Sequence, residues 1–229
     1  MRSSSNVRRL EGWALCVALA ACGRADAPVR DTGAAARIPL EKIESFGSLA
    51  SRREAQGWLD AAREAIVLRR SQDAAISLAD AATFLHDEAR GAPGDAGPAL
   101  ERAAEELDSL AGVAALGNLR APKALDRVYA NVHAAEALLH LVRANGAMVR
   151  REAVRAGEEI VMSVDHLERA AKHANAEKDS IVRAAIADAR SLADEMVRGM
   201  EAVPDEAAKM TDEIERAVRR IGNVPGGTS

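Results

Sequence analysis

The sequence predicts an all-α protein, either an antiparallel helical bundle or a set of stacked helical hairpins, with about seven helices. Alanine has the highest helix propensity, and the 229-residue chain contains 51 alanines. Aromatic residues make up only 2% of the chain, which is too few for the core of a β-sandwich or a β-barrel. From about residue 47 onward, apolar residues recur at spacings of three and four, the pattern of helices with one buried face.

Residues 1–21 have the organisation of a bacterial signal peptide. Three arginines precede an apolar stretch at 13–20 that is too short to cross a bilayer. The segment Leu19-Ala20-Ala21-Cys22 resembles the lipobox of bacterial lipoproteins. This resemblance implies that the signal peptide is cleaved before Cys22 and that the Cys22 thiol carries the lipid that attaches the protein to a membrane.

The same resemblance implies a destination in the cell envelope. Gly23, where inner-membrane lipoproteins have Asp, favours the periplasmic face of the outer membrane. Two alternatives remain, an ordinary secretory signal and an N-terminal helix that happens to contain a cysteine. The other cysteine, Cys16, lies in the segment that would be removed, so lipidation of Cys22 leaves no thiol for a disulfide.

The rest of the chain divides by composition into a tether, a helical domain and a tail. Residues 22–46 are mostly small and polar and contain two prolines, which predicts a lipidated cysteine followed by a flexible tether. Residues 47–222 carry the helical pattern and form the expected domain. Residues 223–229 are predicted to be disordered.

Capping residues, glycines and prolines set the expected helix boundaries. The expected ranges are 48–70, 72–90, 98–111, 122–145, 147–174, 176–201 and 204–221. Asn145-Gly146 is a typical C-terminal stop for the fourth helix. The fifth helix either continues to residue 201 or breaks between Asn175 and Ser180, and we favour the break.

One internal segment resembles known helical hairpins. Trp58, Ala62, Ala74, Leu78 and Ala81 have spacings similar to those of a tetratricopeptide helix pair. The run from Ala62 to Leu85 is also similar to the hairpin of the exported YfdX-like proteins. Both resemblances imply two antiparallel helices in close contact.

Charge and motifs exclude several classes of function. A net charge of −4 lacks the basic excess of a nucleic-acid-binding protein. The sequence has no GxSxG nucleophile motif, no phosphate-binding glycine loop, no HExxH zinc motif and no CxxCH haem motif. We therefore expect no catalytic activity, no cofactor and no small-molecule substrate.

Four histidines recur at intervals of seven residues on the fourth and fifth expected helices. These histidines, and two glutamates that continue the second column, are His133, His140, His166, His173, Glu152 and Glu159. A turn near Gly146 would place residues opposite each other when their numbers sum to about 292. The expected pairs are then His140 with Glu152, His133 with Glu159, and Asp126 with His166.

Two interpretations of these columns are open. Imidazole–carboxylate pairs could be half-sites for Zn²⁺ or Cu²⁺. Residues seven apart lie about 10 Å apart along a helix, however, and each level holds only two ligands where zinc prefers three or four. The favoured interpretation is that the columns flank the core in solvent and form weak ion pairs, so we assign no metal site.

These features favour a membrane-anchored, non-catalytic helical module that interacts with another envelope protein. The alternative function is a periplasmic protein that binds zinc or copper through the histidine and glutamate columns, or a stress-related helical protein.

Overall fold

In the computed structural model, which describes residues 55–200 and 203–222, the chain forms seven α-helices and, within those ranges, no strand. The prediction of an all-α bundle is therefore confirmed. A helix over residues 55–67 is followed by α2 (Ser71–Gly91), α3 (Ala96–Ala115), η1 (Pro122–Leu125, a 3₁₀ turn), α4 (Asp126–Val149), α5 (Ala153–Ala174), α6 (Ser180–Val197) and α7 (Pro204–Gly222). The expected signal peptide, Cys22, the tether and the tail lie outside the described residues.

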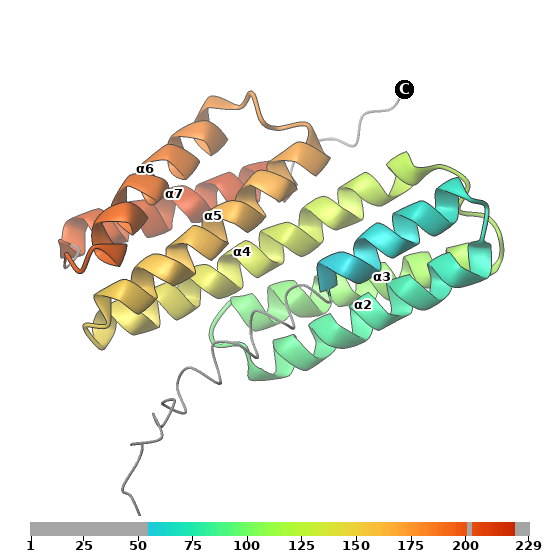
Figure 1. Cartoon of the computed structure of the whole chain (residues 1–229), viewed down its shortest axis with the longest axis horizontal. Helices are drawn as coiled ribbons and strands as arrows, with labels where there is room; N and C mark the ends of the chain where they lie inside the picture. Colours follow the sequence, from blue (N-terminus) through green and yellow to red (C-terminus); the bar gives the residue numbers. More distant parts are fainter. Residues whose placement is uncertain (1–54, 201–202, 223–229) are drawn as a thin grey trace, which may run out of the picture. The chain divides into compact units, whose positions relative to one another are not determined.

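Helix α4 is the central element of this fold. It packs against α3 on one side and against α5 and α7 on another, as Figure 1 shows. Thirteen of its 24 residues are buried, among them polar residues as well as apolar ones. Because several helices cover α4, residues that flank the apolar face of this helix are also buried.

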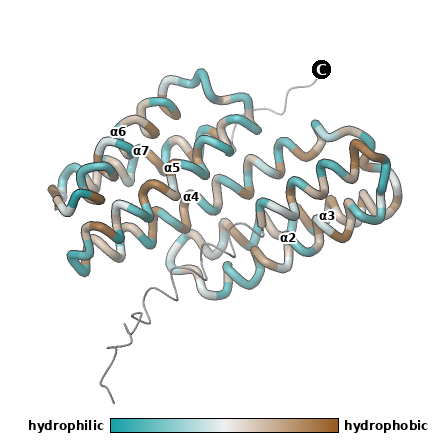
Figure 2. Tube along the Cα trace, viewed as in Figure 1, coloured by the Kyte–Doolittle hydropathy of each residue, from teal (hydrophilic) through white to brown (hydrophobic). Residues whose placement is uncertain are grey.

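Alanine and leucine make up most of the core. One cluster joins residues 55–67, α2, α3 and one face of α4, and two further clusters join α4 to α5, α6 and α7. Apolar and polar residues alternate along each helix (Figure 2), as expected for helices that bury one face. Within the described residues, no helix combines the length and apolar character that a membrane-spanning segment requires.

The favoured break after the fifth helix is confirmed. Asn175, with φ of 56°, adopts the left-handed conformation that commonly ends a helix. Helix α6 then begins with a capping residue, because the Asp179 carboxylate accepts hydrogen bonds from the backbone N–H groups of Ile181 and Val182.

The expected stop at Asn145-Gly146 is wrong. Helix α4 continues through Gly146 to Val149, and the chain turns at residues 150–152, where Arg151 has φ of 60°. Ala144 and Ala147, which flank the expected stop, are both fully buried in the core. Packing of these alanines outweighs the cost of about 1 kcal/mol for a glycine inside a helix.

Helices α5 and α6 approach each other closely at Gly157. A Cβ atom added to Gly157 would lie 2.8 Å from the backbone nitrogen of Val197 and 3.0 Å from the carbonyl oxygen of Ala193. Both of these atoms belong to the backbone of α6 and cannot rotate away. The absence of a side chain at Gly157 therefore allows the contact between the two helices.

Replacing Gly157 by Ala is expected to destabilise the protein by about 2 kcal/mol, because the added methyl group overpacks the α5–α6 contact. Urea denaturation of the full-length chain measures this change. Gly112→Ala is the matched control, because Gly112 lies inside α3 with no atom within 4 Å of an added Cβ. It should stabilise by about 0.5–1 kcal/mol. Equal effects of the two substitutions would contradict the close-contact argument.

Candidate metal centre

Polar residues at seven-residue intervals face one another across the α4–α5 interface. The facing pairs are Asp126–His173, His133–His166 and His140–Glu159. Within these pairs, 3.5 Å separates Asp126 Oδ1 from His173 Nδ1, 3.3 Å separates the two Nδ1 atoms of the middle pair, and 2.6 Å separates His140 Nδ1 from Glu159 Oε2. We call these six residues together with Glu136 the seam.

The structure corrects the expected pairing by seven residues. Facing residues have numbers that sum to 299 instead of about 292, because the turn lies at residues 150–152 and not near Gly146. Glu152 consequently lies at the turn and not opposite His140. Its carboxylate forms ion pairs with Arg150 at 2.9 Å and with Arg155 at 3.5 Å.

The expectation that these residues lie in solvent is wrong for the centre of the seam. The side chains of His133 and His140 are each only 2% exposed, and that of His166 is 4% exposed. The coverage of α4 by several helices explains the difference, because it turns a flanking position into a core position. His173 and Glu159, at the two ends, are half-buried.

Three ligand atoms converge in the middle of the seam. The Glu136 Oε2 atom lies 3.1 Å from His133 Nδ1 and 2.9 Å from His166 Nδ1. We call His133, Glu136 and His166 the triad; all three residues are buried. Triads of this size are compact enough to surround a single metal ion.

Glu136 is the member of the triad that the sequence analysis missed. It follows His133 by three residues, so both side chains lie on the same face of α4. The i, i+3 spacing of His133 and Glu136 was therefore a usable signal. Glu136 lies outside the columns of residues seven apart that predicted the other candidate ligands.

The triad holds Glu136 in its charged form. Burial by itself raises the pKa of Glu136, but the electrostatic interaction with His166 and the hydrogen bonds from His133 and His166 lower this pKa well below its ordinary value of 4.5. At the end of the seam, the pKa of His173 is lowered, mainly because of burial and also because of electrostatic interactions with His133 and Arg63. The centre of the seam therefore carries a buried negative charge that depends on its imidazole partners.

One polar atom of the triad lacks a partner in the described part of the chain. The Nε2 atom of His133 is fully buried and forms no hydrogen bond there. A buried polar atom without a partner costs about 1–3 kcal/mol of stability. An apolar residue at this position would avoid that cost but would lose the hydrogen bond between His133 Nδ1 and Glu136.

The four imidazoles form a continuous column that alternates between α5 and α4. Ring centroids lie 5.7 Å apart from His173 to His133, 5.5 Å from His133 to His166, and 5.4 Å from His166 to His140. The first and last of these ring pairs are nearly parallel. Each imidazole ring is thus adjacent to the next one along the whole seam.

The helix over residues 55–67 contacts the Asp126 end of the seam. Arg63 forms an ion pair with Asp126, and its guanidinium group lies 5.6 Å from the centre of the Tyr129 ring. The buried Tyr129 hydroxyl donates a hydrogen bond to the carbonyl oxygen of Leu59, and the Tyr129 ring packs edge-on against His173. These contacts connect the first described helix to α4 and α5.

His86, the fifth histidine, lies outside the seam. Its Nδ1 atom is 3.0 Å from Glu101 and its Nε2 atom is 3.1 Å from Asp108, so it joins α2 to α3 near the surface. These two hydrogen bonds raise the pKa of His86. Because its two nitrogens point to different carboxylates, His86 does not converge with them on one position.

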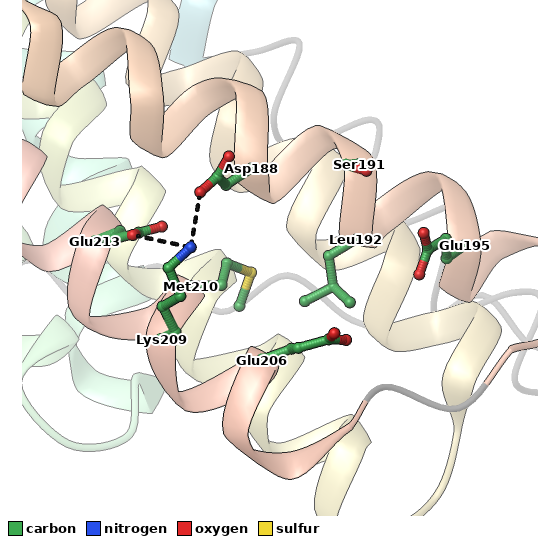
Figure 3. Close-up of a pocket in the computed structure, with 8 residues that line it drawn as sticks. All are labelled: Asp188, Ser191, Leu192, Glu195, Glu206, Lys209, Met210 and Glu213. Carbon is green, nitrogen blue, oxygen red and sulfur yellow. Dashed lines mark hydrogen bonds and ion pairs between the residues drawn. The ribbon is translucent and has the colours of Figure 1, made fainter.

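A surface pocket of about 240 Å³ lies between α6 and α7 (Figure 3). It is lined by Asp188, Ser191, Leu192, Glu195, Glu206, Lys209, Met210 and Glu213. Lys209 Nζ lies 3.1 Å from Asp188 and 3.5 Å from Glu213, which neutralises part of its acidic wall. The lining includes no histidine or cysteine, so the pocket offers a transition metal fewer suitable ligands than the triad.

Replacing Glu136 by Gln is expected to destabilise the protein by about 3 kcal/mol, because it breaks a buried ion pair. Glu168→Gln is the control: Glu168 pairs with Arg190 at the surface, at 2.6 Å, and its loss should cost less than about 1 kcal/mol. Urea denaturation of the full-length variants measures both changes.

Glu136→Gln should also change how the stability of the protein depends on pH in acid. Because the folded-state pKa of Glu136 lies below its ordinary value of 4.5, this carboxylate stabilises the fold above that pH, and the contribution is lost as the pH falls toward the folded-state pKa. Glu136→Gln should therefore reduce the loss of stability between neutral pH and about pH 3. An unchanged acid dependence would show that the triad does not hold Glu136 charged.

Comparison of the chain with protein-family models, with curated proteins and with solved structures found no match.

Proposed function

We propose that this protein binds a divalent transition-metal ion, Zn²⁺ or Cu²⁺, at the triad of His133, Glu136 and His166. The observation that carries the proposal is the convergence of two imidazole nitrogens and one carboxylate oxygen in a buried position. The three atoms lie 2.9, 3.1 and 3.3 Å from one another. In the described part of the chain, no other group of histidine, cysteine or acidic residues places one ligand atom from each of three residues this close together.

The distances within the triad fit the size of a zinc site. Ligands that lie about 2.0–2.1 Å from a tetrahedral zinc ion are about 3.3–3.4 Å from one another. The distances between the triad atoms are shorter than this by at most a few tenths of an ångström. Small side-chain movements of the triad would therefore accommodate the ion.

The kinds of ligand favour a transition metal over calcium or magnesium. Imidazole nitrogen suits zinc and copper, whereas calcium and magnesium prefer sites made only of oxygen atoms. The negative charge of Glu136 would compensate part of the charge of the ion.

A purely structural role for the seam is the competing interpretation. Buried polar groups can specify the register of two helices without binding any ligand. That role requires only the contacts within the protein, so adding metal would leave the stability of the fold unchanged. Metal titration therefore separates the two interpretations.

We also propose that the protein is a lipoprotein of the cell envelope, anchored through Cys22. This proposal rests on the signal peptide and the lipobox at Leu19-Ala20-Ala21-Cys22. An interaction with another envelope protein is compatible with such an anchor. The anchor is supported by the sequence of residues 1–23, whereas metal binding is supported by a specific side-chain cluster.

Calorimetric titration of the full-length chain with Zn²⁺ is expected to give one bound ion per chain. Glu136→Gln and His166→Gln, which each remove one ligand, should weaken binding by more than about 100-fold. His86→Gln is the matched control, because His86 also contacts two carboxylates but lies outside the triad. It should leave the affinity unchanged.

Thermal unfolding gives an independent measurement that does not need the variants to fold well. Zn²⁺ at about 100 times its dissociation constant should stabilise the unmodified protein by about 2.7 kcal/mol. No bound Zn²⁺ or Cu²⁺ and no thermal shift would contradict the proposed function and favour the structural role.

Mass spectrometry of the protein isolated from membranes tests the anchor. We expect the chain to begin at Cys22 and to carry a diacylglycerol-containing modification, because the lipobox directs both cleavage and acylation. Cys22→Ser removes the thiol and should release the protein from the membrane fraction. An intact N-terminal methionine, or a free thiol at Cys22 in the exported protein, would contradict this proposal.

A further inference from the structure

The two ends of the seam differ in their access to solvent. At one end, the side chains of Asp126 and His173 are 28% and 19% exposed. At the other end, Glu159 is 16% exposed and His140 only 2% exposed. The triad lies between these layers, and none of its side chains is more than 8% exposed.

We infer that the Asp126–His173 layer is the entrance through which a divalent transition-metal ion reaches the triad. This inference rests on the proposed function. Asp126 supplies a carboxylate oxygen and His173 an imidazole nitrogen, 3.5 Å apart. Both are suitable transient ligands for the same ion that the triad would hold.

The column of imidazoles connects this layer to the triad. The His173 ring is nearly parallel to the His133 ring, at an angle of 20° and a centroid distance of 5.7 Å. An ion bound between Asp126 and His173 is therefore next to His133, the first ligand of the triad. Exchange of one imidazole for the next would let the ion move inward without losing all of its protein ligands.

The opposite end is less suited to admit an ion. His140 Nδ1 and Glu159 Oε2 form a short contact of 2.6 Å, and the His140 ring is buried. An ion that entered there would first have to separate these two atoms. The longer Asp126–His173 contact leaves more room between its ligand atoms.

Arg63 controls access to the entrance in this arrangement. Its guanidinium group forms an ion pair with Asp126 and is itself 37% exposed. Its positive charge repels an approaching cation and occupies the carboxylate that the cation would use. Because Arg63 belongs to the helix over residues 55–67, it can release Asp126 without disturbing the α4–α5 pair.

The rate of metal uptake by the full-length chain tests the inference. Co²⁺ is the probe, because its visible absorbance reports its coordination, and stopped-flow mixing with excess Co²⁺ gives the uptake rate. Asp126→Asn should slow uptake by about tenfold, the lower end of charge-steering effects on association. His173→Gln should also slow uptake, because the entering ion loses its imidazole ligand. Arg63→Gln should accelerate uptake. Glu159→Gln, at the opposite end, is the matched control and should leave the rate unchanged.

Equilibrium titration of the same variants with Co²⁺ separates this inference from the proposed function. The inference requires that Asp126→Asn and His173→Gln still bind one Co²⁺ with nearly unchanged affinity. It is overturned, while metal binding stands, if both variants take up Co²⁺ at the unmodified rate or if Glu159→Gln slows uptake as much as they do. A large loss of affinity in Asp126→Asn would also overturn it, by making Asp126 a permanent ligand. If the unmodified chain binds no Co²⁺, both proposals fail.

Discussion

The register between α4 and α5 is the constraint on which the rest of the structure depends. It places Asp126, His133 and His140 of α4 opposite His173, His166 and Glu159 of α5. A register different by seven residues would leave each imidazole facing a different partner, and Glu136 would lose its contact with His166. Because α5 also packs against α6 and α7, the same register positions the second half of the bundle.

This register places polar residues that are costly to bury at the centre of a core that is otherwise mostly apolar. Much of the core is alanine, and an alanine buries little apolar area, so each apolar contact stabilises the fold only modestly. A buried carboxylate and three buried imidazoles replace apolar residues at the centre of the molecule. Hydrogen bonds within the triad offset the desolvation of Glu136, yet His133 Nε2 remains without a partner in the described part of the chain. Perturbed and costly polar groups of this kind concentrate at functional sites.

The helices around the seam contribute in different ways. Gly157 allows α6 to approach α5 closely, which supports the buried side of the α4–α5 pair. The helix over residues 55–67 instead reaches the seam through side chains, because Arg63 contacts Asp126, and Tyr129 bonds to Leu59. Close helix packing thus supports α5 near the Glu159 end of the seam, whereas the Asp126 end is covered by the charged and partly exposed side chain of Arg63.

The sequence by itself determined the helical class, the break between Asn175 and Ser180, and the start of the last helix at Pro204, because helix propensity, caps and apolar spacing act locally. It also indicated that the histidines form columns. Only the tertiary structure decided which residues face each other, since a pattern that repeats every seven residues fits equally well after a shift of seven. The shift depended on burial of Ala144 and Ala147, which carries α4 past Gly146. Burial of the seam was likewise a tertiary property, because it required neighbours of α4 that lie far from it in the sequence.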